Sequence, residues 1–136
     1  MSDQLKKNPP SIHIKVKVTA VTNPANGATE YVQKFDPEVI PVTENDTLLV
    51  FKLVKPTPDD VIVTGVKPVQ EGNTQLSKPS ISQNGKTVVI IDDNTTKETL
   101  NLNFTFGPAK SSSRLAMAAC NAATIYPEIE NEPPVP

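Results

Sequence analysis

The chain has 136 residues, a net charge of −2 and a single cysteine, Cys120. That length fits one domain that can bury a core without disulfide bonds or a structural metal. Because the chain lacks Trp, has only 4% aromatic residues and carries no excess positive charge, we do not expect it to bind nucleic acid. Its 14 prolines against 5 glycines favour strands and loops over long helices.

We expect neither a Sec-type signal nor a membrane-spanning segment in this sequence. Residues 1–10 are polar, contain Lys6 and Lys7, and lack an apolar run after them, so we expect a flexible arm rather than a Sec-type signal. No window approaches 18 apolar residues, so no membrane-spanning helix is expected. We predict a cytoplasmic protein, although the sequence leaves open export by a route without a classical signal.

The first two elements form a predicted hairpin. Residues 12–21, IHIKVKVTAV, alternate between apolar and polar side chains, which predicts a strand with Ile12, Ile14, Val16 and Val18 on the core face. Residues 23–28 contain Asn and Gly and predict a turn. Residues 29–35 then predict the returning strand.

Two prolines interrupt the next apolar segment. Because proline cannot donate a hydrogen bond to a neighbouring strand, Pro37 and Pro41 predict that residues 39–43 lie at a sheet edge or at a switch between sheets. After a polar turn at residues 43–47, residues 47–54 are apolar on both faces apart from Lys52. That pattern predicts a central strand covered on both sides.

Further strands are predicted in the second half of the chain. Residues 61–66 form one, and residues 79–91 form a hairpin in which Asn84-Gly85 is a two-residue type I′ turn. Residues 99–106 alternate and place Leu100, Leu102, Phe104 and Phe106 on the core face.

The C-terminal third has a different composition. Residues 111–124 are rich in alanine, which favours a short helix, whereas the surrounding strands favour an extended segment, and the sequence leaves both open. Residues 124–136 are expected to be extended, because Pro127 and later prolines resist helix formation. Seven or eight strands predict an all-β, immunoglobulin-like Greek-key sandwich, with one domain over residues 11–130 and a Pro-rich tail over residues 131–136.

No set of residues predicts catalysis, a cofactor or a metal. His13, the only histidine, lies on the outward face of the first strand and cannot form a metal site alone. Cys120 has no neighbouring cation to favour a thiolate, so we expect a small buried thiol. Turn formation explains the pairs Asp59-Asp60 and Asp92-Asp93, because a calcium loop needs alternating acids, a glycine and a closing Glu. Phosphate-binding and serine-hydrolase motifs are also absent, and we predict that the protein is not an enzyme.

One local pattern resembles the cupredoxins. It is F-x-P-x-x-I-x-V-x-x-N-D-T-x-x-V-F, at Phe35, Pro37, Ile40, Val42, Asn45, Asp46, Thr47, Val50 and Phe51. In that family the pattern leads into a central strand of a sandwich, and copper is held by two His, a Cys and usually a Met. This chain has one His and no such cluster near its end, so the resemblance implies sandwich geometry and no copper site.

A longer resemblance is to the DP-EP family, named after two dipeptides. Asp36-Pro37 stands early in the chain, Glu132-Pro133 stands near its end within IYPEIENEPPVP, and the run KPSISQNGKTVVIIDDN at residues 78–94 also fits. The resemblance implies a small bacterial immunoglobulin-like β-sandwich with no assigned activity and no functional residues to transfer. Tyr126 departs from the pattern, since an Asp is expected before the first proline of the terminal motif.

These observations favour a non-catalytic interaction or structural module that works through a sheet edge or the termini. The candidate residues are Asp36, Pro37, Pro41, Tyr126, Pro127, Glu132 and Pro133, and the expected partner is another protein or a second copy of the chain. Lysines near the N-terminus and acids near the C-terminus could pair within or between chains, or could form a solvated surface. The alternative is a small-ligand or carbohydrate-binding module that uses loops 55–60, 67–79 and 92–98, against which the few aromatic residues argue.

Overall fold

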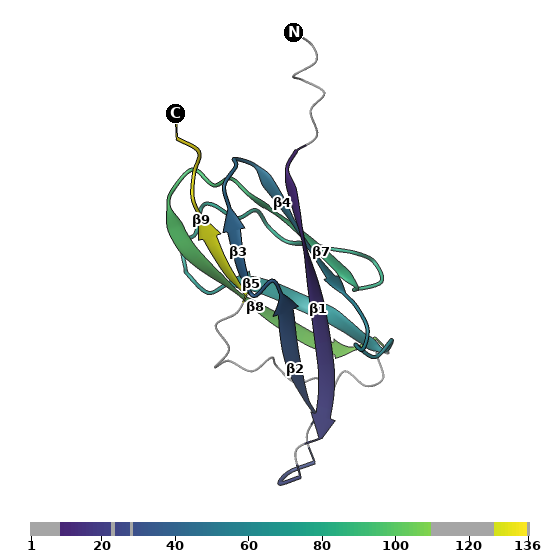
Figure 1. Cartoon of the computed structure of the whole chain (residues 1–136). Helices are drawn as coiled ribbons and strands as arrows, with labels where there is room; N and C mark the ends of the chain where they lie inside the picture. The colour runs from purple at the N-terminus through teal and green to yellow at the C-terminus, as the bar shows by residue number, and fades with distance from the viewer. Residues whose placement is uncertain (1–8, 23, 28, 110–126, 136) are drawn as a thin grey trace.

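The computed structural model describes residues 9–22, 24–27, 29–109 and 127–135, which form two packed β-sheets (Figure 1). The strands in chain order are β1 (Ser11–Thr22), β2 (Thr29–Asp36), β3 (Val39–Val42), β4 (Thr47–Leu53), β5 (Val61–Pro68), β6 (Ser80–Ile81), β7 (Thr87–Asp92), β8 (Glu98–Pro108) and β9 (Glu128–Asn131). The predicted all-β sandwich is confirmed, with nine strands in the described residues rather than seven or eight.

The first sheet has the order β2-β1-β4-β7-β6 and the second has the order β3-β9-β8-β5. The chain leaves the first sheet at Asp36-Pro37, forms β3 at an edge of the second sheet, and returns to the first sheet with β4. Pro37 and Pro41 therefore mark both a sheet switch and an edge strand, as predicted. Two neighbouring pairs, β1 with β4 and β3 with β9, are parallel.

The core lies between the sheets and follows the predicted alternation. Ile14, Val16 and Val18 of β1 are buried, and so are Leu100, Leu102, Phe104 and Phe106 of β8. The ring of Phe104 lies 5.1 Å from that of Phe35 in β2 and 5.1 Å from that of Phe51 in β4, measured between centroids. These contacts join the two sheets through the aromatic side chains that contribute most area to a core.

The strand β4 is central in its sheet but is not covered on both faces. Leu49 and Phe51 face the core, whereas Leu48 and Val50 on the other face are half-buried and Lys52 is exposed. Within the described residues the prediction of cover on both sides was wrong, because the structure has only two sheets and the outward side chains of β4 are half-buried or exposed rather than buried.

The hairpin between β6 and β7 is present, but its turn is not the predicted one. The Gly85 N–H donates to the Ser82 carbonyl at 2.9 Å, so Gln83 and Asn84 are the central residues of the turn. Only Gly85 follows with a positive φ of 73°. A Cβ on Gly85 would lie 2.6 Å from the Cβ of Ile62 in β5, so the position of this glycine is fixed by contact with the other sheet.

The alanine-rich segment 111–124 and Cys120 lie outside the described residues, as do residues 1–8 of the predicted arm. Within the part of the chain that the structure describes, no helix is long and apolar enough to cross a membrane.

Candidate functional site

The proline-containing motifs are placed at the two ends of the parallel pair β3 and β9. Asp36 ends β2 and is joined to Pro37 by a cis peptide bond, and Pro127 precedes β9. The Glu128 N–H donates to the Glu38 carbonyl at 2.9 Å, which joins the beginnings of the two strands. Tyr126 lies outside the described residues.

At the other end of this pair, the Glu132 N–H donates to the Val42 carbonyl at 2.8 Å, and Pro133 follows. Pro41 is exposed within β3, halfway between the two ends. The structure therefore aligns the candidate residues along one strand pair and separates Asp36-Pro37 from Glu132-Pro133 by the length of the strands. They do not converge on one pocket.

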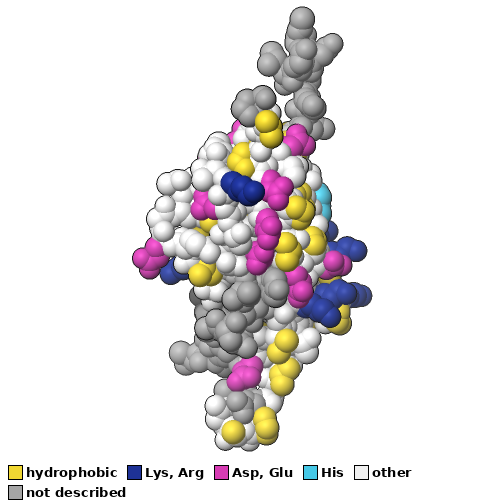
Figure 2. All heavy atoms as spheres, turned by 60° about the vertical axis from the view of Figure 1, so that its left-hand side comes forward, with side chains coloured by type: hydrophobic (Ala, Val, Ile, Leu, Met, Phe, Trp, Pro, Cys, Tyr) yellow, Lys and Arg dark blue, Asp and Glu magenta, His cyan; other side chains and the backbone are white. Residues whose placement is uncertain are grey.

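The outer face of β9 is acidic. Ile129 and Asn131 face inward, so Glu128 and Glu130 share the outer face, and a hydrogen bond between the two carboxyl groups raises the pKa of Glu128. Figure 2 shows acidic side chains in a line on this side of the molecule, with one basic side chain beside them near the upper end and others at the margin. Because Lys15 and Lys17 face outward from the other sheet, the basic first strand does not pair with these acids within one chain.

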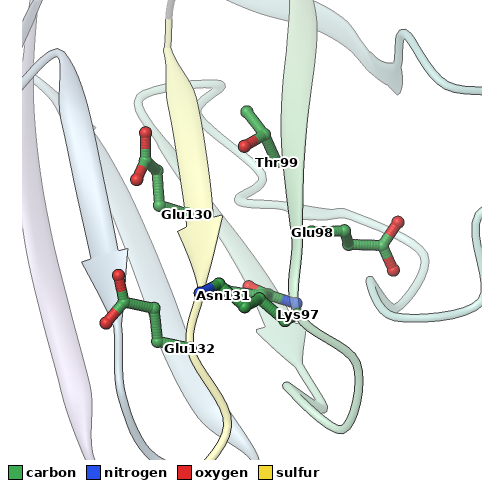
Figure 3. A pocket seen from close by; sticks show the side chains of 6 residues that line it. All are labelled: Lys97, Glu98, Thr99, Glu130, Asn131 and Glu132. Carbon is green, nitrogen blue, oxygen red and sulfur yellow. The ribbon is translucent and has the colours of Figure 1, made fainter.

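A shallow depression of about 320 Å³ lies beside the end of β9. It is lined by Lys97, Glu98 and Thr99 at the start of β8 and by Glu130, Asn131 and Glu132 (Figure 3). The Glu98 and Glu130 side chains point away from one another in this view. The Glu98 and Glu130 carboxylates therefore do not face a common point in the depression.

A buried polar cluster lies behind this depression and was missed in the sequence. Asp92, Asn94 and Asn131 are at most 1% exposed. One Asp92 carboxylate oxygen, Oδ1, accepts hydrogen bonds from the Asn94 N–H and from Asn131 Nδ2, both at 3.0 Å. The turn predicted at Asp92 is present, since its side chain accepts from the N–H two residues on, but Asp92 itself is the last inward position of β7 after Val88 and Ile90.

The Asn94 side chain ties three chain segments together. With a positive φ of 51°, it directs Nδ2 to the carbonyl oxygens of Val42 at 3.1 Å, Glu44 at 3.1 Å and Glu132 at 3.3 Å. The second Asp92 oxygen, Oδ2, has no hydrogen-bond partner within the described structure. Burial raises the pKa of Asp92, while the hydrogen bonds from Asn131 and Asn94 act in the opposite direction.

The period-two pattern was the signal that could have revealed this cluster. In β7 the inward series Val88, Ile90, Asp92 continues past the apolar residues, and in β9 Asn131 follows Ile129 on the inward side. Two polar residues at core positions of neighbouring segments are expected to bond to each other. The side-chain N–H groups of Asn94 and Asn131 donate to acceptors within the protein, so this arrangement is suited to holding the ends of the two sheets together.

The three loops of the alternative ligand-binding interpretation do not form one surface. Gln75 in loop 67–79 bonds to Thr95 in loop 92–98, with 2.7 Å between its Oε1 and the Thr95 N–H. Loop 55–60 follows the opposite end of β4, where the Asp59 carbonyl accepts a hydrogen bond from Lys86 at 2.5 Å.

His13 is exposed on the outer face of β1, and within the described ranges no three His, Cys, Asp or Glu side chains are grouped to hold a metal ion.

The model of the DP-EP family matches residues 10–133, which is nearly the whole chain. No curated protein matches the sequence.

Proposed function

The chain belongs to the DP-EP family, and we propose that it is a non-catalytic interaction module that binds a protein partner through the edge strand β2. The supporting observation is the contrast between this edge and the others. The strand β2 is eight residues long, contains no proline, and pairs in the described structure only with β1, on one side.

The other three edges are protected by devices that prevent pairing with a further strand. The strand β6 has two residues, and β3 has four and contains Pro41. The beginning of the outer edge of β5 is occupied, because the Val63 N–H donates to the Gly85 carbonyl at 2.9 Å and Lys86 Nζ donates to the Val61 carbonyl at 2.6 Å. β2 is therefore the edge best able to accept a partner strand.

The direction of the β2 backbone follows from the bonds that β1 makes to its other neighbour. The Val54 N–H donates to the Val16 carbonyl at 2.9 Å, and the Val18 N–H donates to Thr57 Oγ1 at 2.9 Å. Val16 and Val18 therefore turn their backbone groups toward the β4 side. The alternate residues Lys17 and Thr19 turn theirs toward β2, where Thr19 pairs with Val32. In an antiparallel ladder these directions alternate, so Val32 bonds to β1 and its neighbours present their backbone groups outward.

Along β2, Val32 and Lys34 direct their backbone groups toward β1. The residues that alternate with them, Tyr31, Gln33 and Phe35, therefore direct theirs outward. The side chains on the outer face include Val32, which is 56% exposed. An apolar side chain beside a row of outward N–H and carbonyl groups is the combination that strand addition uses, because the backbone supplies affinity and the side chains supply specificity.

A single substitution tests this edge. Gln33→Pro removes an outward N–H and leaves the ladder with β1 intact, because proline is tolerated where its nitrogen faces away from the neighbouring strand. The matched control is Gln83→Pro, which places the same change at an exposed turn position that favours proline. The readout is the set of proteins retained from a native lysate by each immobilised chain.

We expect the wild type and the Gln83→Pro variant to retain the same partner and the Gln33→Pro variant to lose it. Circular dichroism and thermal unfolding of all three chains establish that the variants are folded. Equal retention by all three chains would show that β2 is not the binding edge and would overturn the proposal.

A further inference from the structure

We propose that the partner is a second copy of this chain, and that the two β2 strands pair antiparallel across a twofold axis at Val32. This inference rests on the proposed function, because it uses the same edge. Pairing in this way would join the two five-stranded sheets of the two copies into one continuous sheet.

The backbone directions limit how two β2 strands can pair. Outward groups occur at Tyr31, Gln33 and Phe35, so these residues must oppose one another across the interface. In an antiparallel pair, that requirement puts the twofold axis at a residue. The candidates near the middle of the strand are Tyr31, Val32, Gln33 and Lys34.

Charge distinguishes these registers. With the axis at Val32, Glu30 lies opposite Lys34 of the second copy, and symmetry repeats this pair on the other side of the axis. With the axis at Gln33, Glu30 would oppose Asp36, and with the axis at Lys34, that lysine would oppose itself. Like charges directly opposite are destabilising and unlike charges are stabilising, so the register centred on Val32 is favoured.

The same register covers the exposed apolar side chain of this edge. Val32 would meet Val32 of the second copy in a pair without backbone hydrogen bonds, the type in which side chains approach most closely. The axis at Tyr31 would instead place Val32 opposite Glu30 and shorten the paired segment. Charge and burial of apolar area therefore select one geometry.

Cysteine crosslinking tests the position of the axis. In a Cys120→Ser background, Val32→Cys places two thiols opposite each other, within the Cα separation of about 4.4–6.8 Å that a disulfide requires. The matched control is Lys34→Cys in the same background, whose thiol would face Glu30 of the second copy. We expect mild oxidation to give a covalent dimer for Val32→Cys and at least tenfold less dimer for Lys34→Cys.

Charge reversal tests the register independently. We expect Glu30→Lys alone and Lys34→Glu alone each to weaken dimerisation by about tenfold, because each opposes like charges at two symmetric pairs. Mixing the two variants pairs unlike charges at both positions again, so the mixture is expected to dimerise about as strongly as the wild type. The measurement is sedimentation equilibrium over a range of concentrations at low salt.

A wild-type chain that stays monomeric at all concentrations would overturn the inference, and so would equal crosslinking of the two cysteine variants. If the wild type is monomeric but retains a different protein through β2 in the lysate experiment, the second copy is excluded and the proposed function stands. If neither assay depends on β2, both fail.

Discussion

Asp92 provides a direct test of how this fold holds its buried polar groups. The side chain is 0% exposed, and its only described hydrogen bonds are those from the Asn94 N–H and Asn131 Nδ2. Asp92→Asn keeps an oxygen that can accept both hydrogen bonds and removes the charge. Asp92→Ala removes the acceptor as well.

The expected magnitudes follow from these contacts. Replacing two hydrogen bonds to a charged acceptor by two to a neutral one costs about 2 kcal/mol, whereas burial of an ionised carboxylate costs several kcal/mol. We therefore expect Asp92→Asn to raise the free energy of unfolding at pH 7 by about 1–3 kcal/mol. Asp92→Ala leaves two buried donors unsatisfied and should be about 2–5 kcal/mol less stable than Asp92→Asn.

The pH dependence has a definite sign. Burial raises the pKa of Asp92 from its ordinary value of 3.8, with Asp93 and Glu98 adding to the effect. Below pH 3.8 the group is protonated in the folded and unfolded chains, and its contribution to stability is fully present. As the pH rises through 3.8 toward the higher folded pKa, only the unfolded chain releases the proton, so stability is lost over that interval.

Urea denaturation of the wild type and Asp92→Asn at a series of pH values gives the difference between their free energies of unfolding. The contributions of the other acidic residues are common to both chains and cancel in this difference. The difference should move in favour of Asp92→Asn as the pH rises above 3.8 and then level off. Asp59→Asn is the matched control, because Asp59 is exposed and is not among the groups that act on Asp92, and it should change stability by less than about 0.5 kcal/mol. A difference that is independent of pH, or that moves in favour of the wild type, would refute the reasoning.

Three further substitutions test contacts that fix the loops, each by urea denaturation. Asn94→Ala should cost about 2–4 kcal/mol, because it removes the donor to three carbonyls and leaves a residue with a φ of 51°; a cost below 1 kcal/mol would contradict the role assigned to this side chain. Gly85→Ala should cost about 1–3 kcal/mol more than Gly72→Ala, since both glycines have positive φ but only at Gly85 would the added Cβ meet another side chain, that of Ile62; equal costs would argue against that close approach. Thr57→Val should cost about 1–3 kcal/mol by leaving the Val18 N–H without its acceptor, and Thr57→Ser, which keeps the hydroxyl, should retain most of that stability.

The strands and the core faces could be predicted because the signal is local. Alternation in β1 and β8 identifies the buried residues from the sequence itself, since successive side chains of a strand point to opposite faces. The pattern in β4 gave the wrong result for its outer face. Whether another layer covers Leu48 and Val50 depends on segments distant in the chain, which periodicity does not describe.

The turn at Gly85 and the position of Asp92 show two different kinds of failure. Gly85 lies so close to Ile62 that a Cβ would not fit, and its carbonyl accepts from the Val63 N–H of the other sheet, which turn preferences do not describe. Asp92 did carry a local signal, because it continues the inward series of β7, but its polarity and the neighbouring Asp93 favoured a turn. Alternation was the more reliable guide at this position.

The candidate edge could not be located from the sequence, because strand order depends on long-range pairing. The β1–β2 hairpin is local, but the parallel pairing of β1 with β4 decides that β2 has no second neighbour in the described sheet. The prolines directed attention to β3, where the edge is indeed found. The sequence of β2 carries no comparable signal, because an edge that can accept a strand is marked only by the absence of such protection.

The placement of the dipeptides gives them a structural role that bears on the proposed function. Asp36-Pro37 carries the chain from β2 to β3, and Glu132-Pro133 ends β9, with the Glu132 N–H bonded to the Val42 carbonyl. Together they begin and end the parallel pair that forms one side of the second sheet. Since that edge strand is short and contains Pro41, it resists further pairing, and the adjacent end of β2 remains the longer, proline-free edge. The two dipeptides therefore bound the β3–β9 pair, and the protection of this edge comes from Pro41 and from the four-residue length of β3.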